Sequence, residues 1–172
     1  MKLVLMGYMA SGKSVIAKYL AEKMDITSID LDEYIENKEG QTIQEIFKNK
    51  GEIYFRIAEN KYLKEILEKK NDVILATGGG TPCYANNMHL IKQKANSIYL
   101  KASINTLAER LLLADDNRPL LSNIKKEDLK EFIAKHLFER NNYYDKADKT
   151  IIVDNKNINE IANEISAIFY SK

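Results

Sequence analysis

The segment that most constrains this chain is Gly7–Ser14, with the sequence GYMASGKS, which matches the pattern G-x-x-x-x-G-K-[ST]. A short apolar run, Leu3–Met6, precedes it, and a segment with helical apolar spacing, Val15–Glu22, follows it. A strand, a glycine turn and a helix N-terminus in this order predict a phosphate-binding loop, because backbone N–H groups and the helix dipole then point at one anion. At average residue usage the pattern alone occurs by chance in roughly one of two hundred chains of this length.

In such a loop Lys13 reaches the β- and γ-phosphates of a nucleotide, and the hydroxyl of Ser14 binds Mg²⁺. We expect the rest of the loop to contact the nucleotide as well. These residues are Gly7, Met9, Ala10, Ser11, Gly12 and Val15. The alternative, a glycine-rich turn with an exposed lysine, leaves the preceding strand and the following helix unexplained.

The composition is that of a soluble globular protein, with 45% hydrophobic and 30% charged residues. A length of 172 residues predicts a single domain spanning residues 1–172. The 26 basic and 25 acidic residues leave a net charge of +1, so we expect neither nucleic acid nor a membrane as a partner. The chain has one cysteine, Cys83, no signal-peptide pattern and no run of eighteen apolar residues, which predicts a cytoplasmic protein.

Strand-like and helix-like segments alternate along the chain. The later segments expected as strands are 26–32, 72–76, 96–100 and 149–154. Amphipathic helical segments separate them, which is the pattern of an α/β fold with right-handed crossovers. We therefore predict a three-layer P-loop kinase fold with a five-stranded parallel sheet and helices on both faces.

Two of the helices have apolar residues that we expect to face the core. In the helix that follows a capping box at Thr42–Glu45, these residues are Ile53, Ile57, Leu63, Ile66 and Leu67. In the helix near residues 127–145, they are Phe132, Ile133, Leu137 and Phe138.

Chemically distinctive residues follow the predicted strands. Asp30 and Asp32 come at the end of the second strand, and the ends of parallel strands face the ligand crevice of an open α/β sheet. The alternative for Asp32 is a helix cap. Three consecutive glycines, Gly78–Gly80, follow the next strand, and such a run indicates that a ligand approaches bare backbone. A plain flexible turn is the alternative there.

Three arginines are candidates for binding anions. Arg56 lies among apolar residues near the start of a long helix, and Arg140 lies one helical turn before Tyr144. Arg118 precedes Pro119 in a polar, irregular segment that is typical of a mobile lid. For Arg56 and Arg118, a solvated surface arginine is the alternative.

Taken together, the ordered motifs resemble those of the shikimate kinase family over nearly the whole chain. They are the phosphate loop, Asp30–Asp32, Gly51–Arg56, Gly78–Gly80, Arg118–Leu121, and Phe138–Arg140 with Tyr144. The phosphate loop by itself indicates only a nucleotide, whereas the acid pair, the glycine triplet and the arginine before Pro-Leu-Leu are specific to this family. The resemblance implies that a monomer uses ATP to phosphorylate the 3-hydroxyl of shikimate, giving shikimate 3-phosphate and ADP, in chorismate and aromatic amino acid biosynthesis.

The resemblance also implies how the acceptor is held. Asp32 would bind the hydroxyls of shikimate, Arg56 and Arg140 would clamp its carboxylate, and the backbone of Gly78–Gly80 would line its site. The substrate-binding segment would span about residues 31–61. This agrees with general chemistry, because a carboxylate can orient a hydroxyl and accept its proton, and a guanidinium binds a carboxylate through two parallel hydrogen bonds.

On the nucleotide side, the resemblance implies that Arg118 lies on a lid of about residues 112–124 and reaches the phosphates. Lys13 and Arg118 would neutralise the phosphate charge, which phosphoryl transfer requires more than covalent help. Arg110 would stack on adenine, and Asp30 would place Mg²⁺ together with Ser14.

Two residues depart from the family pattern. Ala10 stands where the family usually has a glycine, and we expect a negative φ that lets alanine fit without strain. Ala76 stands where the family often has a hydroxyl near the metal, so Mg²⁺ would depend on Ser14, Asp30 and water.

Two other functions compete with this interpretation. Another P-loop small-molecule kinase, such as a gluconate or nucleoside monophosphate kinase, would share the core but would not need Arg56, the glycine triplet and Arg140 together. A GTP-dependent switch protein is suggested weakly by Asp145–Asp148, DKAD, but the chain has no D-x-x-G motif.

Overall fold

The structure is a computed structural model that describes residues 1–113 and 124–170 of the chain. Five strands form one parallel sheet in the order β2-β3-β1-β4-β5. Their bounds are Lys2–Met6 (β1), Thr27–Asp30 (β2), Val73–Ala76 (β3), Asn96–Lys101 (β4) and Lys149–Ile152 (β5). The predicted five-stranded parallel sheet is therefore confirmed.

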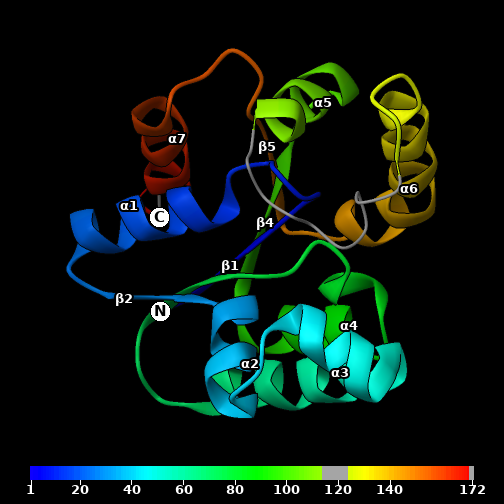
Figure 1. Ribbon diagram of the computed structural model, residues 1–172. Helices are drawn as coiled ribbons and strands as arrows, with labels where there is room; N and C mark the ends of the chain where they lie inside the picture. The colour runs from blue at the N-terminus through cyan, green and yellow to red at the C-terminus, as the bar shows by residue number, and fades with distance from the viewer. Residues whose placement is uncertain (114–123, 171–172) are drawn as a thin grey trace.

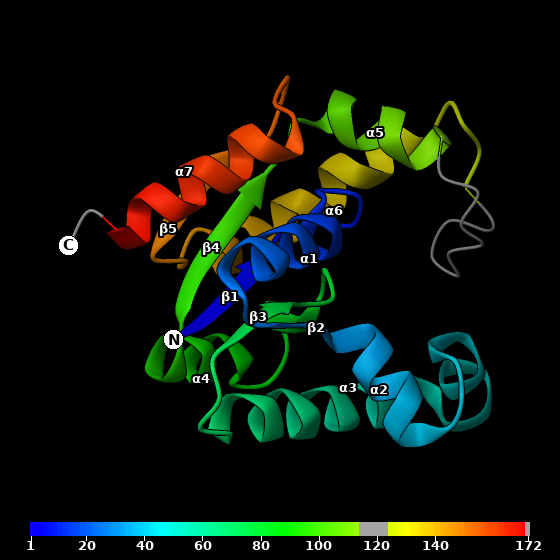
Figure 2. The same cartoon turned by 90° about the vertical axis from the view of Figure 1, so that its left-hand side faces the viewer.

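Helices cover both faces of the sheet, as predicted. Helices α1 (Lys13–Met24) and α7 (Ile158–Tyr170) pack together on one face, whereas α4 (Asn87–Lys94) and α6 (Leu129–Tyr144) lie on the other (Figures 1 and 2). Helix α5 (Ile104–Leu113) packs against α6. Helix α2 (Leu31–Glu39) packs on the long helix α3 (Ile43–Glu68), which also contacts α4 and the short 3₁₀ helix η1 (Thr81–Cys83).

The register of the sheet brings three loops to the same level. Leu5 of β1 is aligned with Ala76 of β3, and Ala76 is aligned with Asp30 of β2. The carboxyl ends of these three neighbouring strands therefore meet at one edge, which is where ligands bind in open α/β sheets. The central strands β1 and β3 are buried almost along their whole length, because helices cover both of their faces.

Strand β2 is shorter than the predicted segment 26–32, since it ends at Asp30. Asp30 is the N-cap of α2, and its side chain accepts hydrogen bonds from the backbone N–H groups of Asp32 and Glu33. Asp32 thus belongs to the first helical turn rather than to the strand. The capping role that was the alternative for Asp32 is performed by Asp30, which leaves the carboxylate of Asp32 for another task.

Helix α3 contains a break at Gly51, whose φ of 82° and ψ of 172° are not helical. The predicted capping box of Thr42 and Glu45 begins this helix. Glu39, at the end of α2, accepts hydrogen bonds from Lys50 before the break and from Tyr54 and Tyr62 after it. This carboxylate therefore ties α2 to both halves of α3.

The prediction that three of the residues face the core is wrong, because Ile53 is 79% exposed, Ile57 is 65% exposed and Phe138 is 85% exposed. An α-helix turns by about 100° per residue, so Ile53 lies about 80° around the helix from the buried Leu63. Phe138 likewise lies about 100° from its buried neighbour Leu137. Within the described part of the chain, no helix is long and apolar enough to cross a membrane.

Candidate active site

The phosphate loop between β1 and α1 has the backbone that anion binding requires. Gly7 and Gly12 have φ values of 148° and 96°, which glycine adopts without a steric cost. A Cβ atom on Gly7 would also lie 2.6 Å from the backbone oxygen of Leu100. Among the described residues no side chain caps α1, so its first N–H groups are available to a phosphate. The ammonium of Lys13 folds back over the loop and donates a hydrogen bond of 2.8 Å to the backbone oxygen of Tyr8.

Ala10, within this loop, has a φ of 62°, so the expected negative φ is wrong. An L-residue with a side chain pays roughly 1–2 kcal/mol to adopt this left-handed backbone. The loop therefore holds Ala10 in a conformation that a glycine would adopt more readily.

Replacing Ala10 by glycine should stabilise the nucleotide-free protein by about 0.5–1 kcal/mol. Relief of the strain outweighs the greater backbone entropy of glycine in the unfolded chain, which is worth about 0.4–1 kcal/mol. The expected rise in melting temperature is about 1–4 °C, measured by thermal unfolding without ATP. A lower melting temperature for Ala10→Gly would show that Ala10 is not strained.

Arg110, at the end of α5, lies beside the same loop. Its Nη1 donates a hydrogen bond of 3.2 Å to the backbone oxygen of Ala10. A cavity of about 210 Å³ opens here, and its lining residues are Ala10, Ser11, Gly12, Val15, Ile16, Arg110, Lys156, Ile158 and Ile161. The lining is largely apolar and includes the guanidinium of Arg110 and the ammonium of Lys156, which suits a stacked heteroaromatic ring with phosphates attached.

Ser14 and Asp30 form a pair of hard oxygen donors beside Lys13. The hydroxyl of Ser14 donates a hydrogen bond of 2.6 Å to Oδ2 of Asp30. Mg²⁺ prefers carboxylate and hydroxyl oxygens and keeps several water ligands, so this pair fits that metal. No group of three or more acidic, histidine or cysteine side chains arranged for a metal occurs among the described residues, so phosphate and water would complete the coordination.

Asp32 is the most perturbed carboxylate beside the loop. Burial raises its pKa to about 7, the negative charges of Asp30 and Glu59 add to this, and Lys13 opposes it. Its Oδ1 is buried without a hydrogen-bond partner among the described residues. A buried acceptor of this kind indicates that a ligand group belongs there.

The glycine triplet Gly78–Gly80 faces three predicted site residues, one for each glycine. A Cβ atom on Gly78 would lie 2.9 Å from Oδ1 of Asp32. One on Gly79 would lie 3.6 Å from Nη1 of Arg140, and one on Gly80 would lie 3.0 Å from Nη1 of Arg56. None of the three glycines has a positive φ, so the backbone conformation does not require glycine. The glycines instead leave space for the side chains of Asp32, Arg140 and Arg56, which argues against a plain flexible turn.

The second glycine also joins this group to the phosphate loop, because its Cβ position lies 3.3 Å from the backbone nitrogen of Met9. Its backbone oxygen accepts a hydrogen bond of 2.5 Å from the hydroxyl of Tyr144, which is fully buried. Tyr144 and Arg140 lie one turn apart on α6, so the same helix holds the triplet and presents the arginine to it.

Sequence reasoning missed Glu59, which is only 1% exposed and lies beside Arg56 and Gly78. It accepts hydrogen bonds from Arg56 at 3.0 Å and from Thr81 at 2.6 Å. Burial raises the pKa of Glu59, although Arg56 and Thr81 act in the opposite direction. The available signal was the spacing of three residues between Arg56 and Glu59, which places them on one side of a helix.

Three more side chains near the site have no predicted role. The hydroxyl of Tyr8 and Nδ1 of His136 are 3.1 Å apart, so the phosphate loop is linked to α6. Cys83 is half-buried, and burial raises the pKa of its thiol to about 11, which keeps it protonated near neutral pH. The predicted Arg118 and most of the predicted lid lie outside the described residues.

Comparison with known proteins gives one consistent result. A family model described as shikimate kinase matches residues 9–169 of this chain. A shikimate kinase of Flavobacterium psychrophilum is 48% identical over 171 residues, covering 98% of this chain and 99% of the relative. One of Sulfurihydrogenibium sp. is 41% identical, covering 94% of this chain and 93% of the relative.

Solved structures agree with this. A shikimate kinase of Bacteroides thetaiotaomicron superimposes with a TM-score of 0.93 at 31% identity, covering 99% of this chain and 98% of that one. A shikimate kinase of Acinetobacter baumannii in complex with shikimate gives a TM-score of 0.90 at 32% identity, covering 99% and 93%.

Proposed function

The chain belongs to the shikimate kinase family, and we propose that the site described above transfers the γ-phosphoryl group of ATP to the 3-hydroxyl of shikimate. The products would be shikimate 3-phosphate and ADP, in the route to chorismate and the aromatic amino acids. The observation that carries the proposal is the glycine triplet, which borders one buried carboxylate and two guanidinium groups. This arrangement suits a small, hydroxylated carboxylic acid: the arginines bind its carboxylate, and Asp32 binds its hydroxyls.

The nucleotide would lie along the phosphate loop. The N–H groups of the loop and of the first turn of α1 would bind the phosphates, and Lys13 would neutralise their charge. The cavity beside Arg110 would take the adenine ring. Ser14 and Asp30 would hold Mg²⁺, which supplies charge neutralisation on the phosphates when it is bound.

Asp32 would act on the acceptor. Its unpaired Oδ1 would accept a hydrogen bond from the reacting hydroxyl, orient the oxygen toward the γ-phosphorus, and take the proton as the new bond forms. Arg118 would add charge from the lid during transfer, a role that stays a prediction from the sequence. We also propose that the protein is a cytoplasmic monomer and that residues 1–172 form one domain.

The test of this function is ADP release with different acceptors. Purified protein with Mg·ATP should release ADP rapidly with shikimate and slowly with gluconate, with nucleoside monophosphates or without an acceptor. Omission of Mg²⁺ should abolish the reaction, because the phosphates then lose most of their neutralising charge. A higher specificity constant for a nucleoside monophosphate than for shikimate would contradict the proposal.

A second prediction concerns the space left by the triplet. Gly80 has a φ of −90°, so alanine fits its backbone, but a methyl group would lie 3.0 and 3.1 Å from the two Nη atoms of Arg56. Gly80→Ala should therefore fold normally, bind ATP normally and raise KM for shikimate by about tenfold or more, since one displaced charge partner is worth about 1.4 kcal/mol or more. Steady-state kinetics and an ATP-binding titration measure this. An unchanged KM would mean that the carboxylate of shikimate does not bind beside Gly80.

A further inference from the structure

The guanidinium of Arg56 makes hydrogen bonds along its edges and an aromatic contact on one face. Its Nη1 donates to the buried Glu59 at 3.0 Å. Its Nε and Nη2 donate to Oε1 of Glu52 at 3.4 and 3.3 Å. The mouth of the fork, between Nη1 and Nη2, points at Gly80, because both nitrogens lie nearer to its Cβ position, at 3.0 and 3.1 Å, than Cζ does, at 3.4 Å.

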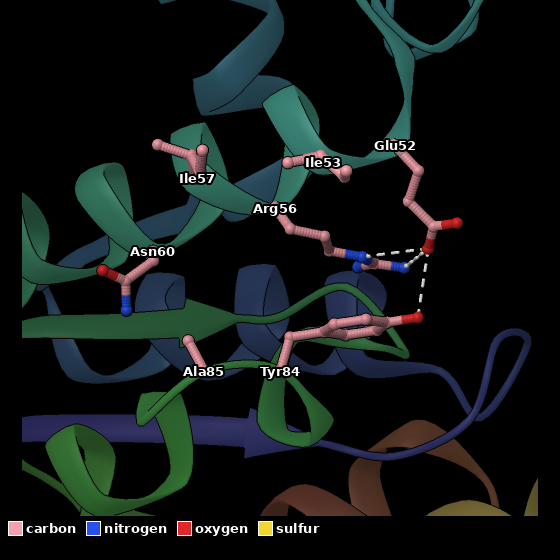
Figure 3. A pocket seen from close by; sticks show the side chains of 7 residues that line it. All are labelled: Glu52, Ile53, Arg56, Ile57, Asn60, Tyr84 and Ala85. Carbon is pink, nitrogen blue, oxygen red and sulfur yellow. Dashed lines mark hydrogen bonds and ion pairs between the residues drawn. The ribbon is translucent and has the colours of Figure 1, made fainter.

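One flat face of the guanidinium lies on Tyr84. The Cζ atom of Arg56 is 3.8 Å from the centroid of the Tyr84 ring, and Figure 3 shows the guanidinium above this ring. The hydroxyl of Tyr84 donates a hydrogen bond of 3.0 Å to Glu52, the same oxygen that Arg56 contacts (Figure 3). The side chain of Arg56 is consequently only 18% exposed although it lies beside an open surface pocket.

From this geometry we infer that Tyr84 is a positioning residue for shikimate: it fixes the tilt of the Arg56 guanidinium so that the open fork receives the substrate carboxylate. The inference rests on the proposed role of Arg56. Hydrogen bonds at the edges of the guanidinium limit its rotation within its own plane, whereas a ring stacked on its face limits its rotation out of that plane. Two parallel hydrogen bonds to a carboxylate require that plane to be fixed.

The charge at this position explains why a ring is suitable. Glu52 and Glu59 already bring two carboxylates to Arg56, and a third would repel an anionic substrate. The face of an aromatic ring attracts a guanidinium without adding a net charge. Tyr84 therefore stabilises the cation and leaves its positive charge available to the carboxylate of the substrate.

The chain holds this ring in place through the loop that also carries the triplet. The backbone N–H of Cys83 donates to the oxygen of Gly80 at 2.9 Å, so the turn after the triplet leads directly to Tyr84. Asn87, which is fully buried, donates to the backbone oxygen of Thr81 at 2.8 Å and accepts from Asn60 of α3 at 2.6 Å. These hydrogen bonds connect the loop of Gly80 and Tyr84, which border the guanidinium of Arg56, to the helix that carries this arginine.

The experiment compares variants of Tyr84 by steady-state kinetics with shikimate at saturating Mg·ATP. Tyr84→Ala should raise KM for shikimate about 5- to 20-fold and change kcat by less than about threefold, because the carboxylate is remote from the reacting hydroxyl. Tyr84→Phe keeps the stacked ring and should stay within about twofold of wild type in KM. Tyr84→Leu keeps an apolar side chain without the ring and should resemble Tyr84→Ala, which covers the case that alanine loosens the loop.

Two controls separate positioning from a general structural role. Tyr19 is as exposed as Tyr84, at 37%, and its hydroxyl also makes one hydrogen bond, to Asn159. Tyr19→Ala should therefore leave KM for shikimate unchanged. In an Arg56→Ala background, adding Tyr84→Ala should cause no further loss, since the partner of the ring is already gone.

The outcomes distinguish this inference from the proposed site. If Arg56→Ala impairs shikimate use severely while Tyr84→Ala and Tyr84→Leu keep the wild-type KM, the positioning role is overturned and the site stands. If Tyr84→Ala lowers the specificity constant equally with and without Arg56, Tyr84 acts through something else and the inference is also overturned. If Arg56→Ala itself has wild-type kinetics, both the site assignment and the inference are wrong.

Discussion

Arg140→Ala is expected to lower kcat/KM for shikimate by about 10²- to 10³-fold while leaving ATP binding unchanged. Removing one partner of a desolvated charge pair costs about 2–5 kcal/mol, because the other charge is left poorly compensated. Arg140 lies on α6 with its Nη1 3.6 Å from the Cβ position of Gly79, and Tyr144 of the same helix donates a hydrogen bond to the backbone oxygen of that glycine. Most of the loss should appear in KM, since the carboxylate is distant from the reacting hydroxyl.

The measurement has a control in the substrate as well as in the protein. A shikimate analogue with a neutral amide in place of the carboxylate should be phosphorylated about equally by wild type and Arg140→Ala, because the charge pair is missing in both cases. Lys135 is an exposed cation on the same helix, so Lys135→Ala should keep wild-type kinetics. Equal weakening of ATP and shikimate by Arg140→Ala would place this arginine in the nucleotide site instead.

The arrangement of the main parts could be predicted because each has a strong local signal. The phosphate loop has a motif with a required context, and the alternation of strands and helices predicts which strand ends share an edge. Gly78–Gly80 is predicted to line the site, because three consecutive glycines are unfavourable unless a ligand must approach bare backbone. What the sequence could not supply is which atom faces each glycine, since that depends on the packing of α3 and α6 against the sheet.

The errors have specific physical causes. Ile53, Ile57 and Phe138 were assigned to the core by their apolar character, although their angular positions on the helices place them away from the buried face. The φ of Ala10 could not be deduced from its identity, because the loop around it imposes the conformation. The burial of Glu59 could not be predicted, because a glutamate on an amphipathic helix is usually exposed to solvent and only the fold shows that this one is buried.

The two acids at the end of β2 illustrate how an offset of two residues changes a role. Asp30 ends the strand, caps α2 and contacts Ser14, which suits the metal side. Asp32, two residues later, is the second residue of α2, and its unpaired Oδ1 lies 2.9 Å from the Cβ position of Gly78 in the glycine triplet. The sequence predicts that both acids lie at one strand end. Only the structure shows that α2 begins between them, so that their side chains point in different directions.

Asp32→Asn should therefore lower kcat/KM for shikimate by about 10³-fold. Asparagine keeps the size and one acceptor oxygen, but it removes the negative charge and the group that takes the proton. A positioned general base contributes typically about 10²–10⁴-fold, and a loose transition state needs little early deprotonation, so loss of orientation supplies part of the effect. The variant should bind ATP normally in a direct titration.

The same substitution has an opposite effect on stability, which separates loss of function from loss of folding. Burial raises the pKa of Asp32 to about 7 in the folded protein, well above the 3.8 of an aspartate exposed to water. Its contribution to stability is therefore fully present below pH 3.8 and is lost as the pH rises through about 7, because folding then buries a charge that the unfolded chain exposes to water. Asparagine stays neutral, so in the absence of Mg²⁺ and nucleotide the melting temperature of Asp32→Asn relative to wild type should increase between pH 5 and pH 8. Wild-type shikimate kinetics in a stably folded Asp32→Asn protein would show that this carboxylate does not bind the acceptor, and the site would have to be assigned again.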